Sequence, residues 1–285
     1  MLRKVIKTTE FDVLYEQYES THELVKTLSE RPLNSAYEGS TPVQKELRES
    51  WHGVSKMSEA HDMLYYGWNK EIEKFKTQIK INSASLQYKP KQRLVADYVG
   101  AAPIVANAIM GIPKAMVGTN YKPKRHKILH LLIDCGVSSM YSPSEILEWG
   151  SKIVATINRL EQEGYRCKVE VMYNFGLRSG RTQQVLRFKV KDEGHPIDLQ
   201  RFTFPMAHPA MFRAVGFNWE ETLPGGKALG GKGQPLNTYN DDDRNKILKV
   251  LTDKDGLVIY ANIRTDLQQV LKDKIGWSNG KEVVK

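Results

Sequence analysis

The sequence predicts an α/β fold in the carboxy-terminal half of the chain, with a mostly parallel sheet and helices on both of its faces. Residues 128–133 form an almost continuous apolar run of strand length, typical of a strand covered on both faces. Residues 143–162 then place apolar side chains at three- and four-residue intervals, which predicts an amphipathic helix. Residues 165–173 alternate apolar and polar side chains. A strand, a helix and a second strand in this order predict a parallel pair with a right-handed crossover.

The remaining elements of this half follow from the same periodicities. We expect a third strand at 185–190, two short helices within 198–215, a strand at 257–263 and a final helix at 265–275. The link to the third strand is short and rich in Gly, Arg and Ser, which predicts an antiparallel hairpin at the sheet edge. The resulting order is βαββαβα.

The first 127 residues are expected to be mainly helical. The patterns predict a strand within 5–18 followed by a short helix capped near Ser20, a helix starting near Ser58, an amphipathic helix over 69–80, and a short helix over 103–110. We therefore expect two regions, a mainly helical one at 1–127 and an α/β domain at 128–285.

Charge is concentrated in the middle of the 285-residue chain, whose net charge is +9. Residues 70–127 carry 12 Lys and Arg against 3 Asp and Glu, so this basic segment alone has a net charge of +9. Its candidate phosphate-binding cations are Lys70, Lys74, Lys76, Lys80, Lys89, Lys91, Arg93, Lys122, Lys124, Arg125 and Lys127. Phe75, Tyr88 and Tyr121 are interleaved with them, and aromatic rings among cations can stack on unpaired bases. The alternative is a solubilising face beside a linker.

A second candidate site is the sequence Asp134-Cys-Gly-Val-Ser138-Ser, at the carboxyl end of the first predicted parallel strand, where open α/β sheets bind ligands. It resembles the metal-binding loop of von Willebrand factor A domains, whose pattern is Asp-x-Ser-x-Ser. The resemblance implies a degenerate domain of that kind, with Asp134 and Ser138 as metal ligands. Gly136 stands where that family has its first serine. The alternative is that Asp134 and Ser138 cap a turn.

Three further motifs resemble an uncharacterised family of tailed-phage and mobile-element proteins. They are Trp51-His-Gly-Val-Ser-x-x-x-Glu-Ala60, Gly100-Ala-Ala-Pro103 through Gly111-Ile-Pro113, and His208-Pro-Ala-Met-Phe-Arg213. This resemblance implies a phage origin. It assigns no chemistry to any residue.

Three hypotheses follow, and the first is favoured because the positive charge is confined to one segment. In the first hypothesis, the chain is a phage protein that binds the nucleic-acid backbone through its basic segment. In the second, it is a non-enzymatic interaction module that contacts a phage or host protein through Asp134 and neighbouring loops. A third hypothesis is a metal-dependent hydrolase using Asp134.

The expected setting of the protein is the cytoplasm, that of the host if the chain is phage-encoded. No apolar run of eighteen residues indicates a membrane partner, and only two cysteines occur, which we read as reduced core residues. No cofactor is expected, with a divalent metal as the alternative.

Overall fold

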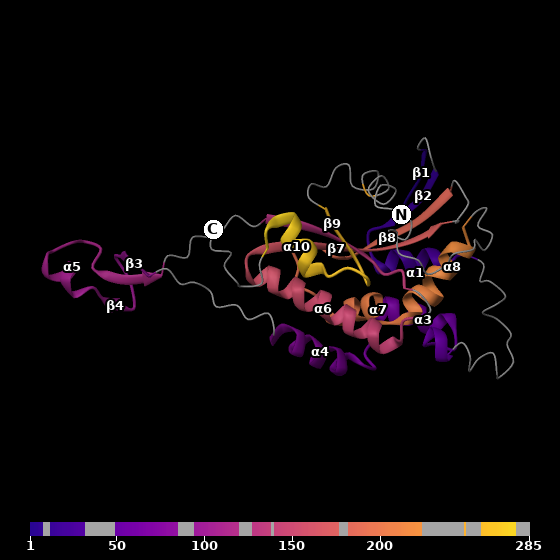
Figure 1. Cartoon of the computed structure of the whole chain (residues 1–285), viewed down its shortest axis with the longest axis horizontal. Helices are drawn as coiled ribbons and strands as arrows, with labels where there is room; N and C mark the ends of the chain where they lie inside the picture. Colours follow the sequence, from indigo (N-terminus) through magenta and orange to yellow (C-terminus); the bar gives the residue numbers. More distant parts are fainter. Residues whose placement is uncertain are drawn as a thin grey trace. The chain divides into compact units, whose positions relative to one another are not determined.

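The computed structural model describes residues 1–7, 12–31, 49–84, 94–119, 127–137, 140–176, 182–223, 248 and 258–277. The chain forms two compact units (Figure 1). The main unit comprises Met1–Leu86 and Lys127–Lys285, and the inserted unit comprises Gln87–His126. The inserted unit therefore interrupts the main unit in sequence.

A six-stranded sheet forms the centre of the main unit, in the order β1-β2-β8-β7-β6-β9. Its strands are β1 (Leu2–Lys7), β2 (Asp12–Tyr18), β6 (Lys127–Asp134), β7 (Tyr165–Gly176), β8 (Thr182–Lys191) and β9 (Val258–Asn262). β6 is parallel to β7 and to β9, and β2 is parallel to β8. The pairs β1 with β2 and β7 with β8 are antiparallel. The sheet is mixed and mostly parallel, and the predicted parallel pairing of β6 with β7 is confirmed.

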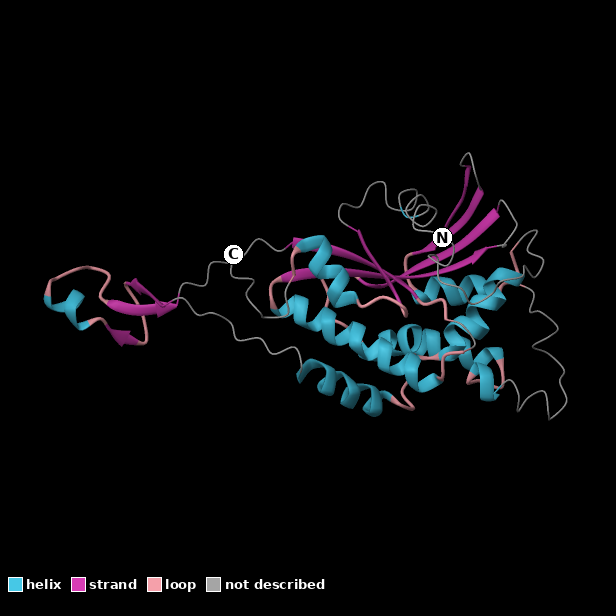
Figure 2. Cartoon of the chain, in the orientation of Figure 1, coloured by secondary structure: helices cyan, strands magenta, loops and turns pink. Residues whose placement is uncertain are grey.

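The described helices of the main unit lie on one face of this sheet (Figure 1, Figure 2). They are α1 (Thr21–Ser29), α3 (Met57–Tyr66), α4 (Ile72–Ala84), α6 (Pro143–Gln162), α7 (Leu199–Ala207), α8 (Phe217–Glu221) and α10 (Leu267–Ile275), with a π-helical turn at Met211–Gly216. Their apolar side chains share one core with inward strand residues such as Leu131, Val171 and Phe188. Within the described residues, no helix is both long and apolar enough to span a bilayer.

The central helix α6 forms where its local signals indicate. Ser142 accepts a hydrogen bond from the amide of Glu145, and the Glu145 side chain accepts one from the amide of Ser142, a capping box with Pro143 directly after it. Gly164, at φ +91°, follows the carboxyl end of the helix. Ile146, Ile153 and others on the same stripe are buried against the sheet.

The opposite face of the sheet carries a second, smaller core. It consists of Val13, Tyr15, Leu132, Met172 and Val185, with Leu248, Val258 and Tyr260 packed against it. Leu248, the one described residue between 223 and 258, is helical and packs on this core, so the expectation of helices on both faces stays a prediction.

The separate, mainly helical amino-terminal region is also not confirmed. Residues expected to form one strand build the hairpin of β1 and β2, and β2 pairs with β8. β8 is antiparallel to β7 as predicted, but it is not an edge strand because β2 and β1 extend the sheet beyond it. A division at residue 127 would separate strands that belong to one sheet.

The inserted unit is a small three-stranded sheet in the order β3-β5-β4. Its elements are β3 (Leu94–Asp97), β4 (Ala102–Pro103), α5 (Val105–Ile109) and β5 (Met116–Thr119). Because β3 and β4 flank β5, the link between them must cross that strand. A Cβ at Gly100 would lie 2.0 Å from the carbonyl oxygen of Val117, and one at Gly118 would lie 3.0 Å from that of Val99. The crossing therefore requires glycine at both positions.

Candidate functional site

Four of the predicted cations lie on or beside α4. This helix buries Phe75 and Ile79, four residues apart, and packs on α6, where the Asn82 side-chain amide donates to Ser151 Oγ at 2.8 Å. Lys70, Lys74 and Lys80 are exposed and Lys76 is half-buried. Lys74, Lys76 and Lys80 lie on the helix outside the buried stripe of Phe75 and Ile79, and Lys70 lies in the turn before the helix. The predicted amphipathic helix is confirmed.

Two of these lysines form ion pairs along the helix. Lys74 Nζ lies 3.3 Å from a carboxylate oxygen of Glu71, and Lys76 Nζ lies 2.7 Å from one of Glu73. Both pairs are exposed, and such pairs contribute only about 0.2–1 kcal/mol each. Residues 70–84 therefore keep a net charge of +2, from four Lys against two Glu, and an anion can displace either glutamate at little cost.

The remaining cations are divided between the two units. Lys127 is exposed at the start of β6. Lys89, Lys91, Arg93, Lys122, Lys124 and Arg125 lie outside the described residues. The structure therefore brings together Lys70, Lys74, Lys76 and Lys80, and it leaves the grouping of the others as a prediction.

Asp134, the predicted metal ligand, is fully buried at the end of β6. Its Oδ1 accepts a hydrogen bond from the amide of Gly136 at 2.9 Å, and its Oδ2 accepts one from the Tyr260 hydroxyl at 2.7 Å. Ser138 lies outside the described residues. Both Asp134 oxygens thus accept hydrogen bonds from within the fold, one in the following turn and one from strand β9. For Asp134, this agrees with the turn-capping alternative to metal binding. Among the described side chains, no group of three or more His, Cys, Asp or Glu has metal-binding geometry.

Two of the three sequence motifs meet in the helical layer. Arg213 donates from Nη1 to the carbonyl oxygen of Trp51 at 2.9 Å, and its guanidinium lies 5.3 Å from the Trp51 ring centroid. Gly53, at φ +78°, contacts His208 so closely that a Cβ would lie 2.9 Å from the imidazole. Trp68 packs edge-on against the same ring. The motifs therefore form a packing junction, in which His208 is a buried, packed histidine.

Burial dominates the chemistry of His208. It lowers the pKa of the imidazole to about 4, with the nearby Lys70 acting in the same direction. Nδ1 accepts a hydrogen bond from the amide of Ala210 at 3.0 Å. The ring is therefore neutral near pH 7 and helps to start the following helical turn.

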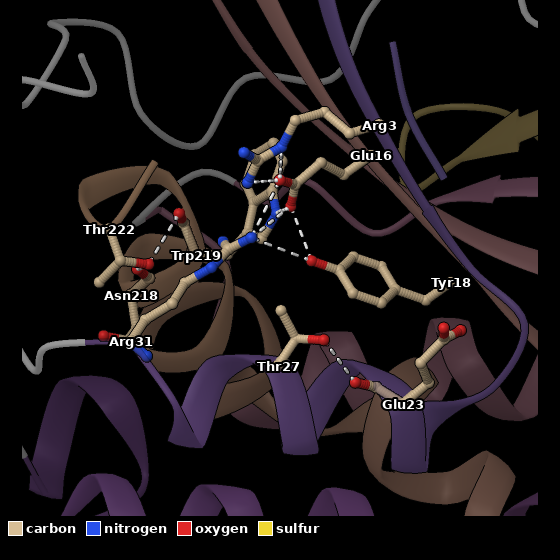
Figure 3. A network of polar contacts seen from close by, with 9 residues as sticks. All are labelled: Arg3, Glu16, Tyr18, Glu23, Thr27, Arg31, Asn218, Trp219 and Thr222. Atoms are coloured by element: carbon tan, nitrogen blue, oxygen red, sulfur yellow. Dashed lines mark hydrogen bonds and ion pairs between the residues drawn. The ribbon is translucent and has the colours of Figure 1, made fainter. Parts of the chain in front are cut away.

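A buried carboxylate, Glu16, joins four elements of the helical face (Figure 3). It accepts hydrogen bonds from Arg3 Nε at 2.6 Å, Tyr18 Oη at 2.7 Å, Trp219 Nε1 at 2.6 Å and Arg31 Nη2 at 2.9 Å. Burial raises the pKa of Glu16, but the hydrogen bonds from Tyr18, Arg31 and Trp219 outweigh it and hold the pKa below its usual value. The network ties β1, β2 and α8 to the chain after α1.

A second buried carboxylate, Glu170, lies on the opposite face of the six-stranded sheet, the face that carries the smaller core. His130 Nε2 lies 2.6 Å from Glu170 Oε2, Arg187 forms a direct ion pair with the same carboxylate, and Lys168 Nζ lies 3.6 Å away. Burial raises the pKa of Glu170, yet His130 and Arg187 lower it to about 2. Arg187 also reaches Tyr15 Oη at 3.4 Å. These residues link β2, β8, β7 and β6, and sequence analysis did not single out either buried acid.

A small pocket at the start of α1 also gathers charged groups, including His22, Lys189, His195 and Arg201. Lys189 Nζ lies 3.1 Å from Glu19 and 3.0 Å from Asp192. Because its central cation is held by two carboxylates, this pocket suits a phosphate less well than the outer face of α4.

Comparison with family models finds one match, a domain of unknown function (DUF7192), over residues 4–272. No curated protein and no solved structure matches the chain. The matched residues include strands at both ends of the large sheet and the described residues of the inserted unit.

Proposed function

We propose that this chain, which belongs to the DUF7192 family, binds the phosphate backbone of nucleic acid through its basic segment. The observation that carries the proposal is the group of exposed or half-buried lysines on α4 and in the turn before it, Lys70, Lys74, Lys76 and Lys80. Phosphates bound there would release condensed counterions, which is the main source of sequence-independent affinity.

A short duplication in the sequence supports the same proposal. Tyr-Lys-Pro-Lys occurs at 88–91 and again at 121–124, outside the described residues. The first copy precedes β3 and the second follows β5, and Leu94 is paired with Thr119 across these two strands. Each copy combines two lysines with a tyrosine, the residue types that neutralise phosphates and stack on bases.

The chemistry favours backbone binding over sequence readout. Nine of the eleven candidate cations are lysines, which act as point charges, while bidentate guanine recognition is mainly the work of arginine. We expect affinity for single-stranded and duplex nucleic acid with little sequence preference and strong salt dependence.

The test is a fluorescence-anisotropy titration of a labelled oligonucleotide with the full chain over a series of salt concentrations. The variant Lys74→Gln/Lys80→Gln removes two exposed cations, so the slope of log affinity against log salt should fall by about 1.8 on duplex DNA. The matched control Lys272→Gln/Lys274→Gln removes the same charge from α10, where both lysines are exposed, and should leave the slope near that of the parent.

The ion pairs on α4 provide a test in the opposite direction. Glu71→Gln/Glu73→Gln frees Lys74 and Lys76 without adding a cation, so affinity at low salt should rise several-fold. Absence of oligonucleotide binding at low salt, or equal effects of the α4 and α10 lysine variants, would refute the proposal.

The phage origin and the likeness to von Willebrand factor A domains stay proposals. Both rest on resemblances in the sequence: the first on the three motifs that include Trp51 and Arg213, and the second on the motif that begins at Asp134. The interaction hypothesis centred on Asp134 has less support, because a fully buried carboxylate cannot contact a partner directly.

A further inference from the structure

The inserted unit exposes its large apolar side chains. The exposed fraction is 64% for Tyr98, 81% for Val99 and 80% for Ile109. Val105, Met110 and Ile112 are exposed as well. Among the residues of this unit whose side chains the structure describes, only Gly118 is buried. Residues 94–119, the described part of this unit, enclose no core, so their apolar groups are available to another surface.

Several of these side chains lie close together around α5. Val105 and Ile109 are four residues apart on the helix, which places them on one side of it. The amide of Ile112 donates to the carbonyl oxygen of Asn107 at 2.9 Å, which folds the chain after Gly111 back onto α5. We call the six residues Tyr98, Val99, Val105, Ile109, Met110 and Ile112 the apolar tip.

We infer that the apolar tip is a self-association surface, whose occupant is the apolar tip of a second copy of this chain. All six side chains are at least 40% exposed, and side chains of this kind bury on the order of 100 Å² each. Two tips in full contact would therefore remove about 1,200 Å² from water, the lower bound for a stable specific interface. The surface is thus large enough for a dimer.

The charge distribution favours a second copy as the occupant. Residues 94–119 contain one acid, Asp97, and one base, Lys114, so two tips meet without net repulsion although each chain carries +9. Across a two-fold axis each of these charges can face its opposite. Depletion of charge with exposed aliphatic and aromatic groups is typical of homodimer interfaces.

A lipid surface or a nucleic acid fits this tip less well. α5 is five residues long and has no Lys or Arg, whereas helices that lie in membrane interfaces carry a cationic face. Nucleic-acid backbones need cations, and the tip is neutral. The self-association surface is therefore separate from the lysines of α4.

The experiment is sedimentation equilibrium of the full chain over a concentration series. We expect the parent chain to have twice the mass of a single chain at tens of micromolar. Val99→Glu/Ile109→Glu places two charges on the tip and should raise the dimer dissociation constant at least about a hundredfold. Met140→Glu is the matched control, because Met140 is 89% exposed in the main unit, and it should remain dimeric.

A second measurement tests pairing of the tips without the charged variant, which could also lose the dimer by misfolding. Cys135 and Cys167 are both buried, so Ile109→Cys supplies the accessible thiol for a pyrene label. Excimer fluorescence that disappears on dilution supports pairing of the tips. The inference would be overturned if the parent chain is a monomer at all concentrations, or if Val99→Glu/Ile109→Glu leaves the dimer unaffected. It would also be overturned if the chain is a monomer that binds anionic phospholipid vesicles through the tip in a flotation assay.

Discussion

The buried carboxylate Glu170 should control a large share of the stability of the main unit, and pH is the perturbation that shows it. Its pKa is about 2 in the folded chain, against 4.5 for an ordinary glutamate carboxyl group. The carboxylate is 1% exposed and ion-paired with Arg187, so little solvent screening applies. Because the folded pKa is depressed, its stabilisation is complete above pH 4.5 and is lost as the pH falls toward 2.

The size of the effect follows from the shift of the pKa. A difference of about 2.5 units corresponds to about 3 kcal/mol between the charged and neutral states. About 2 kcal/mol of this should be lost by pH 3 and under about 1 kcal/mol by pH 4. Glu170→Gln leaves Arg187 buried beside a neutral amide, so it should cost about 3–5 kcal/mol at pH 7.

Urea unfolding followed by far-ultraviolet circular dichroism measures these differences. The free-energy gap between the parent chain and Glu170→Gln should narrow by about 2 kcal/mol between pH 7 and pH 3, because Glu170 of the unfolded parent chain takes up a proton below pH 4.5 while the folded chain, with its pKa of about 2, still carries the charge. Glu170→Met/Arg187→Met removes both charges and should recover at least half of the loss. A gap that is constant with pH, or a double variant no better than the single one, would show that the ion pair is not the cause.

Two other predictions concern buried oxygens. Glu16→Gln leaves the guanidinium of Arg31 without its carboxylate and should lower the free energy of unfolding by about 3–5 kcal/mol. Because the pKa of Glu16 is depressed, the difference in stability between the parent chain and this variant should shrink in acid. A loss under about 1 kcal/mol would contradict this prediction. Asp134→Ala removes the acceptor of the hydrogen bonds from Gly136 N and Tyr260 Oη, so the free energy of unfolding, measured by the same assay, should fall by about 3 kcal/mol. An unchanged urea midpoint would mean that Asp134 contributes to binding a partner and not to the stability of the fold.

The elements that could be predicted are those with complete local signals. α6 has its cap at Ser142, its proline at 143 and its apolar stripe within twenty residues, and the strand before it is an unbroken apolar run. α4 was predictable with its exposed lysines because Phe75 and Ile79 fix the inward side of the helix. In each case the deciding interactions are close in sequence.

The pairing of β2 with β8 could not be predicted, because its cause is not local. The alternation of apolar and polar side chains in 5–18 indicates extended chain, but it does not identify the partner strand, which lies about 170 residues away. The residues between β1 and β2 lie outside the described residues. The buried acids were missed for the same reason. Glu16 shares its strand face with Leu14 and Tyr18, a signal for an internal charge, yet its donor Trp219 is 203 residues away.

Taken together, the two proposals predict that self-association through the apolar tip strengthens nucleic-acid binding, which neither predicts alone. If the apolar tips pair, each dimer presents two copies of the basic segment, and an oligonucleotide long enough to reach both binds with the avidity of a bivalent ligand. The salt slope of a dimer engaged by both copies should be about twice that of a monomer, because it counts all neutralised phosphates. Val99→Glu/Ile109→Glu should then halve the slope on a long oligonucleotide although it removes no cation. On an oligonucleotide that fits one copy the slope should not change. An equal loss on both lengths would mean that the tip contacts the nucleic acid itself, and the division between a cationic helix and a neutral tip would be wrong.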